Sequence, residues 1–554
     1  MRLPLLVLAV AAAALASPKD PRGLHADNDT PGSDFNGPTF DLPKDFLIGA
    51  GTAALQIEGS DAEDGKSPSV LSSLVENLAT ANLTSDSPWY GMDPPGMAAD
   101  SYHRYKEDVK MAKALKLQIY RFSVSWPRIL PDGDPSKPNP LGVQYYNNLI
   151  NELKANGIEP MITMNHFDYP LSVLVKTGGW VDKRIVDMFT DYADFLFKTF
   201  GDRVKWWTTV NEPNYYCTNF ALIPVPGLYE RQPGDDYKCV HHTILAHMRA
   251  YRLYEERYRK DQGGKIGAAA LTLWCSPNST SYEDIQAAER ANLFALGSIY
   301  HPVVYGDYPE ALRQRVDHYS ALEGRTESRL PHFSEEEKKL LKGCADFLCF
   351  NAYMGTTVAD GTYAARPTAA EGGGTIQSDR DAIEVGSNTI PGKFGDLFER
   401  ANPWVLREAP KWIHENYNMP IFITENGWGD QRVGDAKHDG PRVGYHSAYL
   451  EQLIRAHNEE NVQVVGYLVW SLLDSYEFTA NFGRKFGLVH VDYEGGTRDR
   501  SLKDSAWFFQ YIGTHRKVPK VAFTFDPDAS GAASTAPTLA VTALVVAALA
   551  VCRI

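Results

Sequence analysis

Several features that define common protein classes are missing from these 554 residues. No low-complexity linker and no block of like charges divides the body of the chain. Lys and Arg (55) are fewer than Asp and Glu (69), so the net charge is −14 and no basic cluster stands out. This balance argues against nucleic acid or anionic lipid as the main partner.

Cysteine is also scarce, with six residues and no Cys-x-x-Cys pair. The spacing therefore predicts no structural zinc site, and we expect neither a metal nor another cofactor. Cys217 and Cys239 flank a loop that contains Pro and Gly, which makes them the best disulfide candidates if the chain is secreted. Cys552 lies in a tail that we expect to be removed, which leaves five cysteines and at least one free thiol.

The N-terminus has the pattern of a secretory signal peptide, which we place at residues 1–16. Met1-Arg2 precedes an apolar run from Leu3 to Leu15 and the small-residue site Ala14-Leu15-Ala16. That run is too short to span a bilayer. We therefore expect entry into the secretory pathway, with an N-terminal segment at residues 17–38 ahead of the folded domain. Three sequons are candidates for N-glycosylation, at Asn28, Asn82 and Asn278.

Residues 526–554 combine small residues, a short spacer and an apolar run from Leu539 to Val551. This order is typical of a glycolipid-anchor signal and predicts an extracellular, membrane-tethered protein. A short spanning helix and an uncleaved hydrophobic tail are the alternatives. A spanning helix needs about 20 apolar residues, and that length is reached only by including Ser534, Thr535 and Pro537.

Between these ends, patterns of buried strands alternate with amphipathic helical patterns. The strands are expected at 46–50, 118–124, 159–165, 204–210, 265–274, 347–353, 420–424 and 464–470. Helices are expected at 100–115, beginning with the capping-type Asp100, and at 141–156, 184–200, 239–260 and 444–459. Eight alternating units predict an α/β fold, a single (β/α)8 barrel at residues 39–525.

Two of these strands end in a glutamate. Glu212 follows the run 204–210, and Glu425 follows the run 420–424. A carboxylate at the end of a buried strand is costly unless it is paired or used. Two of them predict the paired carboxyls of a glycosidase. One would stay protonated because a nearby negative charge raises its pKa, and the other would stay ionised. Arg121 and Tyr353, at the ends of two other strands, are candidates for that second task.

Both segments closely resemble the signatures of glycoside hydrolase family 1, the β-glucosidase family. Five more segments resemble the family's motifs in the family's order: Phe46–Gly59, Tyr120–Trp126, Asn165–Pro170, Asn351–Tyr353 and Trp470–Phe478. The resemblance extends from about residue 40 to residue 525. It implies Glu212 as acid/base and Glu425 as nucleophile, supported by Arg121 and Tyr353. It also implies substrate contacts from Gln56, His166, Asn211, Trp470, Glu477 and Phe478. For Asn351, a place in the site and mere support of its loop are equal alternatives.

Phe478 departs from the family pattern, which has Trp after the glutamate. An indole N–H can donate to a sugar hydroxyl, whereas Phe can only pack, at a net cost of about 0.5–1.5 kcal/mol. Phe167 likewise stands where Trp is usual. We therefore predict a retaining β-glycosidase acting on terminal β-D-glucosides, with fucosides and galactosides as further candidate glycones.

Two alternatives remain. One is an animal-type thioglucosidase acting on glucosinolates, with Lys176 as a candidate contact for the sulfate. The other is a non-catalytic receptor for glycans or proteins, although such members typically lose one catalytic Glu and this chain has both. The aglycone is read by variable loops, and neither it nor the oligomeric state follows from the sequence.

Overall fold

The computed structural model describes residues 35, 37–80, 91–225, 227–368, 373–386, 401–430 and 436–521. The predicted signal peptide, the hydrophobic tail with Cys552, and the sequons at Asn28 and Asn82 lie outside these ranges. Asn278 lies inside them and is exposed, and its main-chain N–H donates to Val358 O at 2.9 Å. Within the same ranges, none of the helices has both the length and the apolar character needed to cross a membrane.

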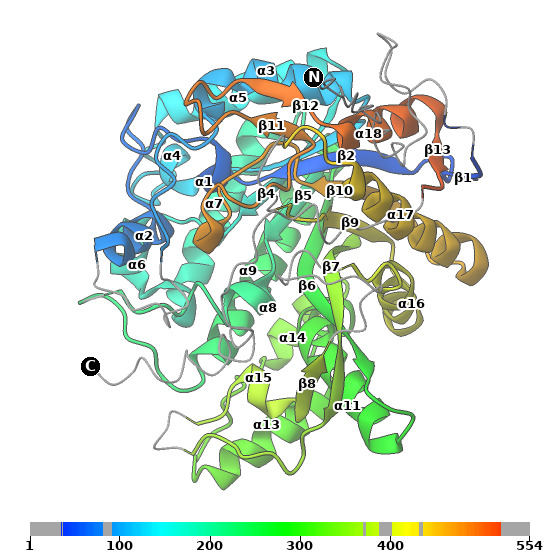
Figure 1. Ribbon diagram of the computed structural model, residues 1–554. Coiled ribbons are helices and arrows are strands. Elements are labelled where there is room, and N and C mark those ends of the chain that lie inside the picture. The colour runs from blue at the N-terminus through cyan, green and yellow to red at the C-terminus, as the bar shows by residue number, and fades with distance from the viewer. Residues whose placement is uncertain are drawn as a thin grey trace, which may run out of the picture.

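Eight parallel strands close into a barrel, which confirms the predicted (β/α)8 fold (Figure 1). Each strand pairs with the next in chain order, and β10 pairs with β2 to complete the ring. The strands are β2 (Leu47–Thr52), β3 (Ile119–Ser123), β4 (Glu159–Asn165), β5 (Trp206–Val210), β6 (Lys265–Pro277), β7 (Phe347–Asp360), β9 (Ile421–Asn426) and β10 (Val464–Trp470).

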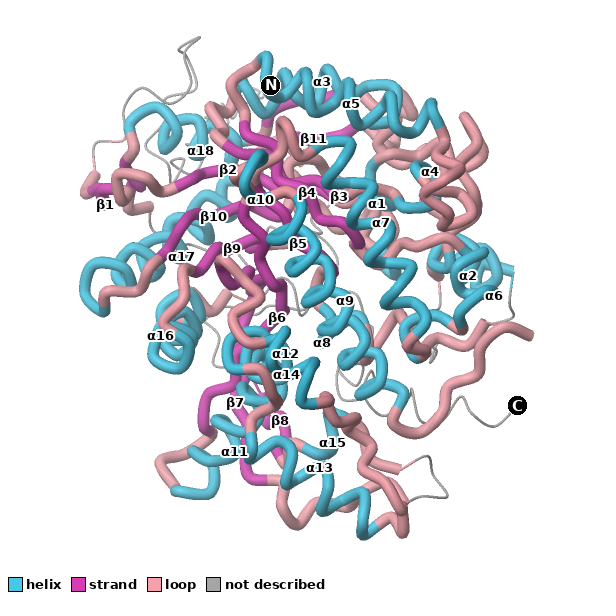
Figure 2. Tube along the Cα trace, turned by 180° about the vertical axis from the view of Figure 1, so that it is seen from behind, coloured by secondary structure: helices cyan, strands magenta, loops and turns pink. Residues whose placement is uncertain are grey.

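Helices surround the strands, and each strand is followed by at least one of them (Figure 2). The main helices are α3 (Ser101–Ala114), α5 (Pro140–Ala155), α7 (Arg184–Phe200), α9 (Asp235–Arg257), α12 (Ser298–Tyr305), α16 (Val405–Tyr417), α17 (Gly440–Glu460) and α18 (Asp504–His515). Shorter ones are α1 (Ala54–Ile57), α2 (Val70–Thr80), α4 (Trp126–Ile129), α6 (Leu171–Thr177), α8 (Pro213–Tyr216), α10 (Arg259–Gln262), α11 (Tyr282–Asn292), α13 (Glu310–Leu322), α14 (Glu335–Leu341) and α15 (Ile376–Asp379). Single turns are the 3-10 segments η1 (Gly179–Val181) and η5 (Phe478–Ala480), and the π-helical turn η2 (Leu293–Gly297).

The interior of the barrel changes character along its axis. Near the start of the strands it is filled by apolar side chains, including Ile119, Met161, Phe347, Phe422 and Leu468. Nearer the carboxyl ends the inward-facing residues become polar. This apolar plug closes one end of the barrel, so polar side chains are concentrated at the other end.

Two short sheets complete the fold at its periphery. Near the chain ends, β1 (Thr39–Asp41) pairs antiparallel with β13 (Lys517–Pro519), and β11 (Val489–Val491) pairs with β12 (Arg500–Leu502). The described elements thus begin at Thr39 and end at Pro519.

Helix α3 begins where the sequence predicts but without a side-chain cap, and α9 begins earlier than predicted. Asp100 is in a left-handed conformation (φ 56°) and does not cap α3; His103 Nδ1 donates to its carboxylate at 2.7 Å. Helix α9 begins at Asp235, ahead of the predicted start at 239, with Asp235 and Asp236 in its first turn. Acidic residues are favourable there because the helix dipole is positive at its N-terminus.

Strands β6 and β7 run further than the sequence predicts, because they pair with each other beyond the barrel from Trp274–Gly355 to Pro277–Val358. With β8 (Ala382–Gly386), α11, α13 and α15 they form a lobe that projects from the barrel at the bottom of Figure 1. The strand alternation there is weak, since the β7 segment is Gly-Thr-Thr-Val.

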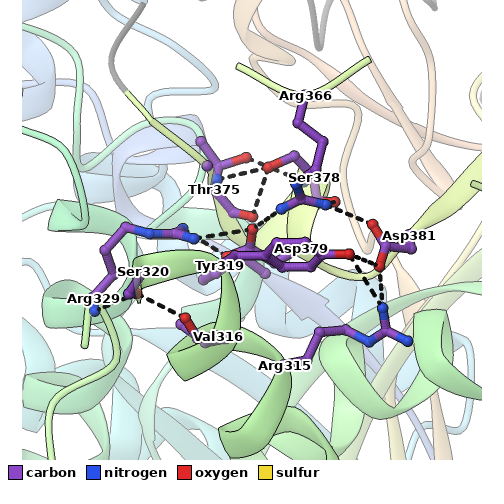
Figure 3. A network of polar contacts seen from close by, with 12 residues as sticks. Arg315, Val316, Tyr319, Ser320, Arg329, Arg366, Thr375, Ser378, Asp379 and Asp381 are labelled. Atoms are coloured by element: carbon purple, nitrogen blue, oxygen red, sulfur yellow. Dashed lines mark hydrogen bonds and ion pairs between the residues drawn. The ribbon is translucent and has the colours of Figure 1, made fainter. Parts of the chain in front are cut away.

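Buried ion pairs fix the loop after β7 to this lobe (Figure 3). The guanidinium of Arg366 bonds both Asp379 and Asp381. Arg329 donates to Asp379 at 2.6 Å, and Arg315 pairs with Asp381. Both carboxylates are almost fully buried, and a buried charge is tolerated only when it is paired in this way.

The predicted disulfide between Cys217 and Cys239 is confirmed, with an S–S distance of 2.03 Å. It joins the residue after α8 to the fifth residue of α9. In the described part of the chain, the remaining cysteines Cys275, Cys344 and Cys349 are free and buried.

Candidate active site

The predicted site residues lie at the carboxyl ends of the barrel strands or in the loops that follow them. Arg121 is in β3, Tyr353 in β7 and Glu425 in β9, while Trp470 ends β10. The others follow directly or within a short loop: Gln56, His166, Asn211, Glu212, Glu477 and Phe478. Because parallel strands of a barrel end on one face, residues far apart in the sequence meet there.

Glu425 is held at both carboxylate oxygens. Arg121 Nη1 donates to Oε1 at 2.5 Å, and the Tyr353 hydroxyl donates to Oε2 at 2.6 Å. The carboxyl is 3% exposed and Arg121 only 1%. Charge-assisted bonds of this length are strong and directional. They fix the orientation of Glu425, in the way that the sequence predicted for a nucleophile.

Arg121 has a partner for each of its nitrogen atoms, which makes its burial acceptable. Besides Glu425, Nε donates to Thr163 Oγ1 at 2.9 Å and Nη2 donates to Asn211 Oδ1 at 2.7 Å. Nη1 also approaches Thr424 O at 3.4 Å. A single cation therefore links three strand ends around the carboxylate.

Glu212 is in a different environment. Its backbone is left-handed (φ 44°), an uncommon conformation for a residue with a side chain, and it immediately precedes α8. Its buried carboxyl accepts a bond at Oε1 from Asn351 Nδ2 at 2.6 Å, and no cation among the described residues bonds to it. Burial, together with the negative charge of Glu425, raises the pKa of Glu212 to about 8, although the Asn351 bond opposes the rise. Burial is the larger cause, whereas the sequence argument rested on the neighbouring charge.

Asn351 belongs to the site, which settles the alternative that the sequence left open. Its Nδ2 also donates to Asn211 Oδ1 at 3.2 Å, and its Oδ1 accepts from Thr424 Oγ1 at 2.5 Å. It lies two residues before Tyr353 on β7, and residues two apart on a strand share a face. That spacing is the signal by which sequence reasoning could have assigned it.

Replacing Asn351 by Ala is expected to move the alkaline limb of the kcat/KM profile to higher pH. The amide stabilises the ionised form of Glu212, so its loss raises the pKa of that carboxyl, by about one unit for a bond of about 1.5 kcal/mol. A pH profile with an aryl β-glucoside measures the shift. The control is Asn292→Ala, another buried asparagine, whose amide bonds the main chain of Cys275. A limb that stays in place or moves to lower pH would contradict this role.

His166 is neutral and has one free N–H. Asn211 Oδ1 accepts from Arg121, so its Nδ2 is the donor to His166 Nε2 at 3.3 Å, which leaves the imidazole proton on Nδ1. Nδ1 is buried and has no partner in the structure as described. Burial, reinforced by the charge of Arg121, holds the pKa of His166 well below its usual value. The ring stacks on Trp470 with centroids 5.6 Å apart. A free donor beside an aromatic face suits a sugar hydroxyl.

Gln56 and Glu477 are both tied to the loop after β10. Gln56 Nε2 donates to Tyr476 O at 2.7 Å, and Ser475 Oγ donates to Glu477 at 2.8 Å. Burial raises the pKa of Glu477 to about 8. A protonated carboxyl at neutral pH can both donate and accept, so Glu477 can donate a hydrogen bond to a sugar hydroxyl or accept one from it.

Phe478 packs against an aromatic cluster that adjoins the site. Its ring lies 4.7 Å from that of Phe220, and Phe167 stacks on both Phe220 and Tyr216 at 5.5 and 5.0 Å. Phe167 and Phe478 are both left-handed, with φ of 73° and 51°. The two aromatic departures from the family pattern therefore lie in one apolar cluster, at the residues that directly follow His166 and Glu477.

Comparison with known proteins identifies the architecture. The model of the family described as Glycosyl hydrolase family 1 matches residues 39–518. The chain belongs to this family. It is therefore a glycoside hydrolase of a retaining β-glycosidase family, as the sequence motifs predicted.

Relatives of this family 1 enzyme cover almost the whole domain. It is 40% identical to Myrosinase 1 of Brevicoryne brassicae over 478 residues, which is 85% of this chain and 98% of that protein. It is 38% identical to human lactase/phlorizin hydrolase over 485 residues; that match takes in 86% of this chain and only 24% of the much longer relative.

Solved structures agree with this placement. The structure of aphid myrosinase is similar with a TM-score of 0.77 at 37% identity, covering 86% of this chain and 99% of that one. Rice Os3BGlu6 β-glucosidase is similar with a TM-score of 0.75 at 33% identity, covering 85% and 98%.

The thioglucosidase alternative named one candidate contact for a sulfate. Lys176, the candidate sulfate contact, is exposed on α6, and its ammonium donates to the carbonyl of Asp132 at 2.6 Å. Among the residues that the structure describes, no group of three or more His, Cys, Asp or Glu side chains could hold a metal ion.

Proposed function

We propose that this family 1 enzyme hydrolyses terminal β-D-glucosides by double displacement, with Glu425 as nucleophile and Glu212 as acid and then base. The proposal rests on one observation, the unequal environments of the two carboxyls. Glu425 accepts from a guanidinium and a hydroxyl, whereas Glu212 accepts from an amide and keeps its proton near neutral pH. Retaining glycosidases need one carboxyl of each kind.

In the first step Glu425 attacks the anomeric carbon while Glu212 gives its proton to the leaving oxygen. The product is a glycosyl ester of Glu425, which no longer has a negative charge. That charge is one cause of the raised pKa of Glu212, so the pKa of Glu212 falls once the ester forms. The ionised Glu212 then takes a proton from water, which attacks the anomeric carbon and releases the sugar. The charge of Glu425 thus keeps Glu212 protonated in the first step, and its loss leaves Glu212 ionised in the second.

The polar side chains around the pair would bind the glucosyl ring. Asn211, whose Oδ1 accepts from Arg121, would bind the 2-hydroxyl, whose hydrogen bonds strengthen in the transition state. Gln56, His166 and Glu477 would bind the outer hydroxyls against Trp470. Since Phe478 offers only packing, fucosides and galactosides are included in the proposal as further glycones.

We also propose that the enzyme acts outside the cell, tethered through its C-terminal tail. The patterns of residues 1–16 and 526–554 support this location. So does the disulfide Cys217–Cys239, because structural disulfides persist in oxidising compartments.

Covalent labelling tests the catalytic assignment. Incubation with 2,4-dinitrophenyl 2-deoxy-2-fluoro-β-D-glucoside is expected to inactivate the enzyme and leave one fluoroglucosyl group on Glu425, located by peptide mass spectrometry. Glu425→Gln should stay unlabelled. A folded wild-type protein that neither takes the label nor hydrolyses p-nitrophenyl β-D-glucoside would overturn the proposal and favour a binding role.

A further inference from the structure

The backbone at Glu212 needs support from outside its own segment. Its left-handed conformation is strained for a residue with a Cβ. The helix that follows, α8, has only four residues. An isolated turn of helix is not stable in water, because nucleation costs more than one hydrogen bond returns. Neighbouring structure must therefore hold α8, and with it the carboxyl of Glu212, in place.

Asn214, the second residue of α8, makes three hydrogen bonds to other elements. Its Oδ1 accepts from Leu271 N at 3.1 Å, and its Nδ2 donates to Leu271 O at 2.7 Å and to Ala295 O at 3.0 Å. The amide thus pairs with both main-chain groups of one strand residue and uses both of its N–H bonds. It connects α8 to β6 and to the π-helical turn η2.

Both attachment points are irregular. Leu271 lies just before the register shift between β6 and β7 at Thr272 and Trp274. Ala295 is in the π-helical turn η2, and its carbonyl also accepts from Ser298 Oγ at 3.3 Å. Such turns depart from the ordinary helical pairing and occur often at functional sites. Here the irregular backbone provides the carbonyl that Asn214 reaches.

Leu271, the strand residue that Asn214 pairs with, also contacts other side chains of the site. The side chain of Leu271 packs against the cluster of Ala53, Tyr353, Trp470 and Phe486. Beyond Asn214, the disulfide of Cys217 holds the far end of α8. Asn214 and the disulfide thus both bond the segment from Glu212 to Cys217 to neighbouring elements, and Asn214 is the nearer of the two to the carboxyl.

We infer that Asn214 is a positioning residue for the general acid, which keeps Glu212 where it can protonate the leaving oxygen. The inference rests on the role proposed for Glu212. Without the clamp, α8 can relax and Glu212 can leave its left-handed conformation, which displaces the proton donor. Proton transfer requires hydrogen-bond geometry, and a displacement of about 1 Å can cost on the order of 100-fold in rate.

The test uses a series of aryl β-glucosides whose phenols differ in pKa, because a poor leaving group depends on protonation and a good one does not. Asn214→Ala is expected to lower kcat/KM about 10- to 100-fold for phenyl β-glucoside. For 2,4-dinitrophenyl β-glucoside the loss should stay within about threefold, so the dependence on leaving-group pKa becomes steeper.

Asn292→Ala is the matched control. Asn292, at the end of α11, makes the same two-fold pairing with the main chain of β6, to Cys275 N and O at 2.9 Å each, and makes no bond to α8. Its loss should reduce the melting temperature and change kcat/KM by the same factor for every substrate of the series. Asn214→Ser, which keeps one hydroxyl at the site, should give an intermediate slope of log kcat/KM against leaving-group pKa. It serves as the second variant if Asn214→Ala folds poorly.

Glu212→Gln separates the two claims. A slope unchanged in Glu212→Gln would reject the acid role itself. A steep slope in Glu212→Gln together with proportional losses in Asn214→Ala and Asn214→Ser, like those of Asn292→Ala, would reject only the positioning role of Asn214.

Discussion

Replacing Glu425 by Gln is expected to lower kcat for an aryl β-glucoside by about 10⁴-fold or more, the scale seen when the nucleophile of a covalent mechanism is removed. Gln has the same shape, and its single carbonyl oxygen can still accept from Arg121, while its NH2 group can donate to the Tyr353 hydroxyl oxygen that donates to Glu425 in the wild-type enzyme. It cannot form the glycosyl ester, and the loss should therefore appear in kcat rather than in binding. Steady-state kinetics with p-nitrophenyl β-D-glucoside measure it.

The same variant has a second readout that does not depend on turnover. The charge of Glu425 contributes to the raised pKa of Glu212, so Glu425→Gln should lower that pKa, which carbon-13 NMR of labelled glutamate can follow. Glu289→Gln is the control, since Glu289 lies on α11 and accepts from Trp412. An active Glu425→Gln enzyme, or one in which the pKa of Glu212 rises, contradicts the assignment.

Replacing Glu212 by Gln is expected to remove both the proton donor and the alkaline limb of the pH profile. Glu212 is protonated below about pH 8 and loses its proton as the pH rises through that value. Acid catalysis by wild-type enzyme is therefore present below about pH 8 and declines above it. Loss of a general acid costs about 10²- to 10⁴-fold for substrates with poor leaving groups.

With 2,4-dinitrophenyl β-D-glucoside the first step needs little protonation, and only the second step lacks its base. The Glu212→Gln enzyme should then show a burst of dinitrophenol followed by slow turnover, as the glycosyl ester accumulates. Stopped-flow absorbance resolves the burst. Persistence of the wild-type alkaline limb in the variant would assign that limb to another group.

The strand ends show how far the sequence could be interpreted alone. Eight buried runs that alternate with helical patterns predicted the barrel. Two of these runs, followed by Glu212 and Glu425, predicted the carboxyl pair, because an apolar strand that ends in a carboxylate is informative locally. The extent of β6 and β7 beyond the barrel was missed, since it depends on their pairing with each other. Asp100 illustrates the same limit at a helix start, where the backbone takes a conformation that its residue type does not reveal.

Within the site, local motifs predicted residue types but not their bonding. The sequence leaves the role of Asn351 open, with its spacing from Tyr353 as the one signal that it belongs to the site, and it gives no signal for Asn214. Their importance comes from atoms that lie far away in the sequence: Glu212 and Thr424 for Asn351, and Leu271 and Ala295 for Asn214.

By itself the sequence predicted the eight-unit barrel, the pair of strand-end glutamates and the disulfide pair, because each rests on composition and spacing along the chain. Only the tertiary structure showed how the surroundings of the two glutamates differ. Arg121 and Tyr353 reach Glu425, while burial and the charge of Glu425 keep the proton on Glu212. The physical reason is that pKa values and orientations depend on the charges and the burial around a group in space, and these are set when distant strands meet.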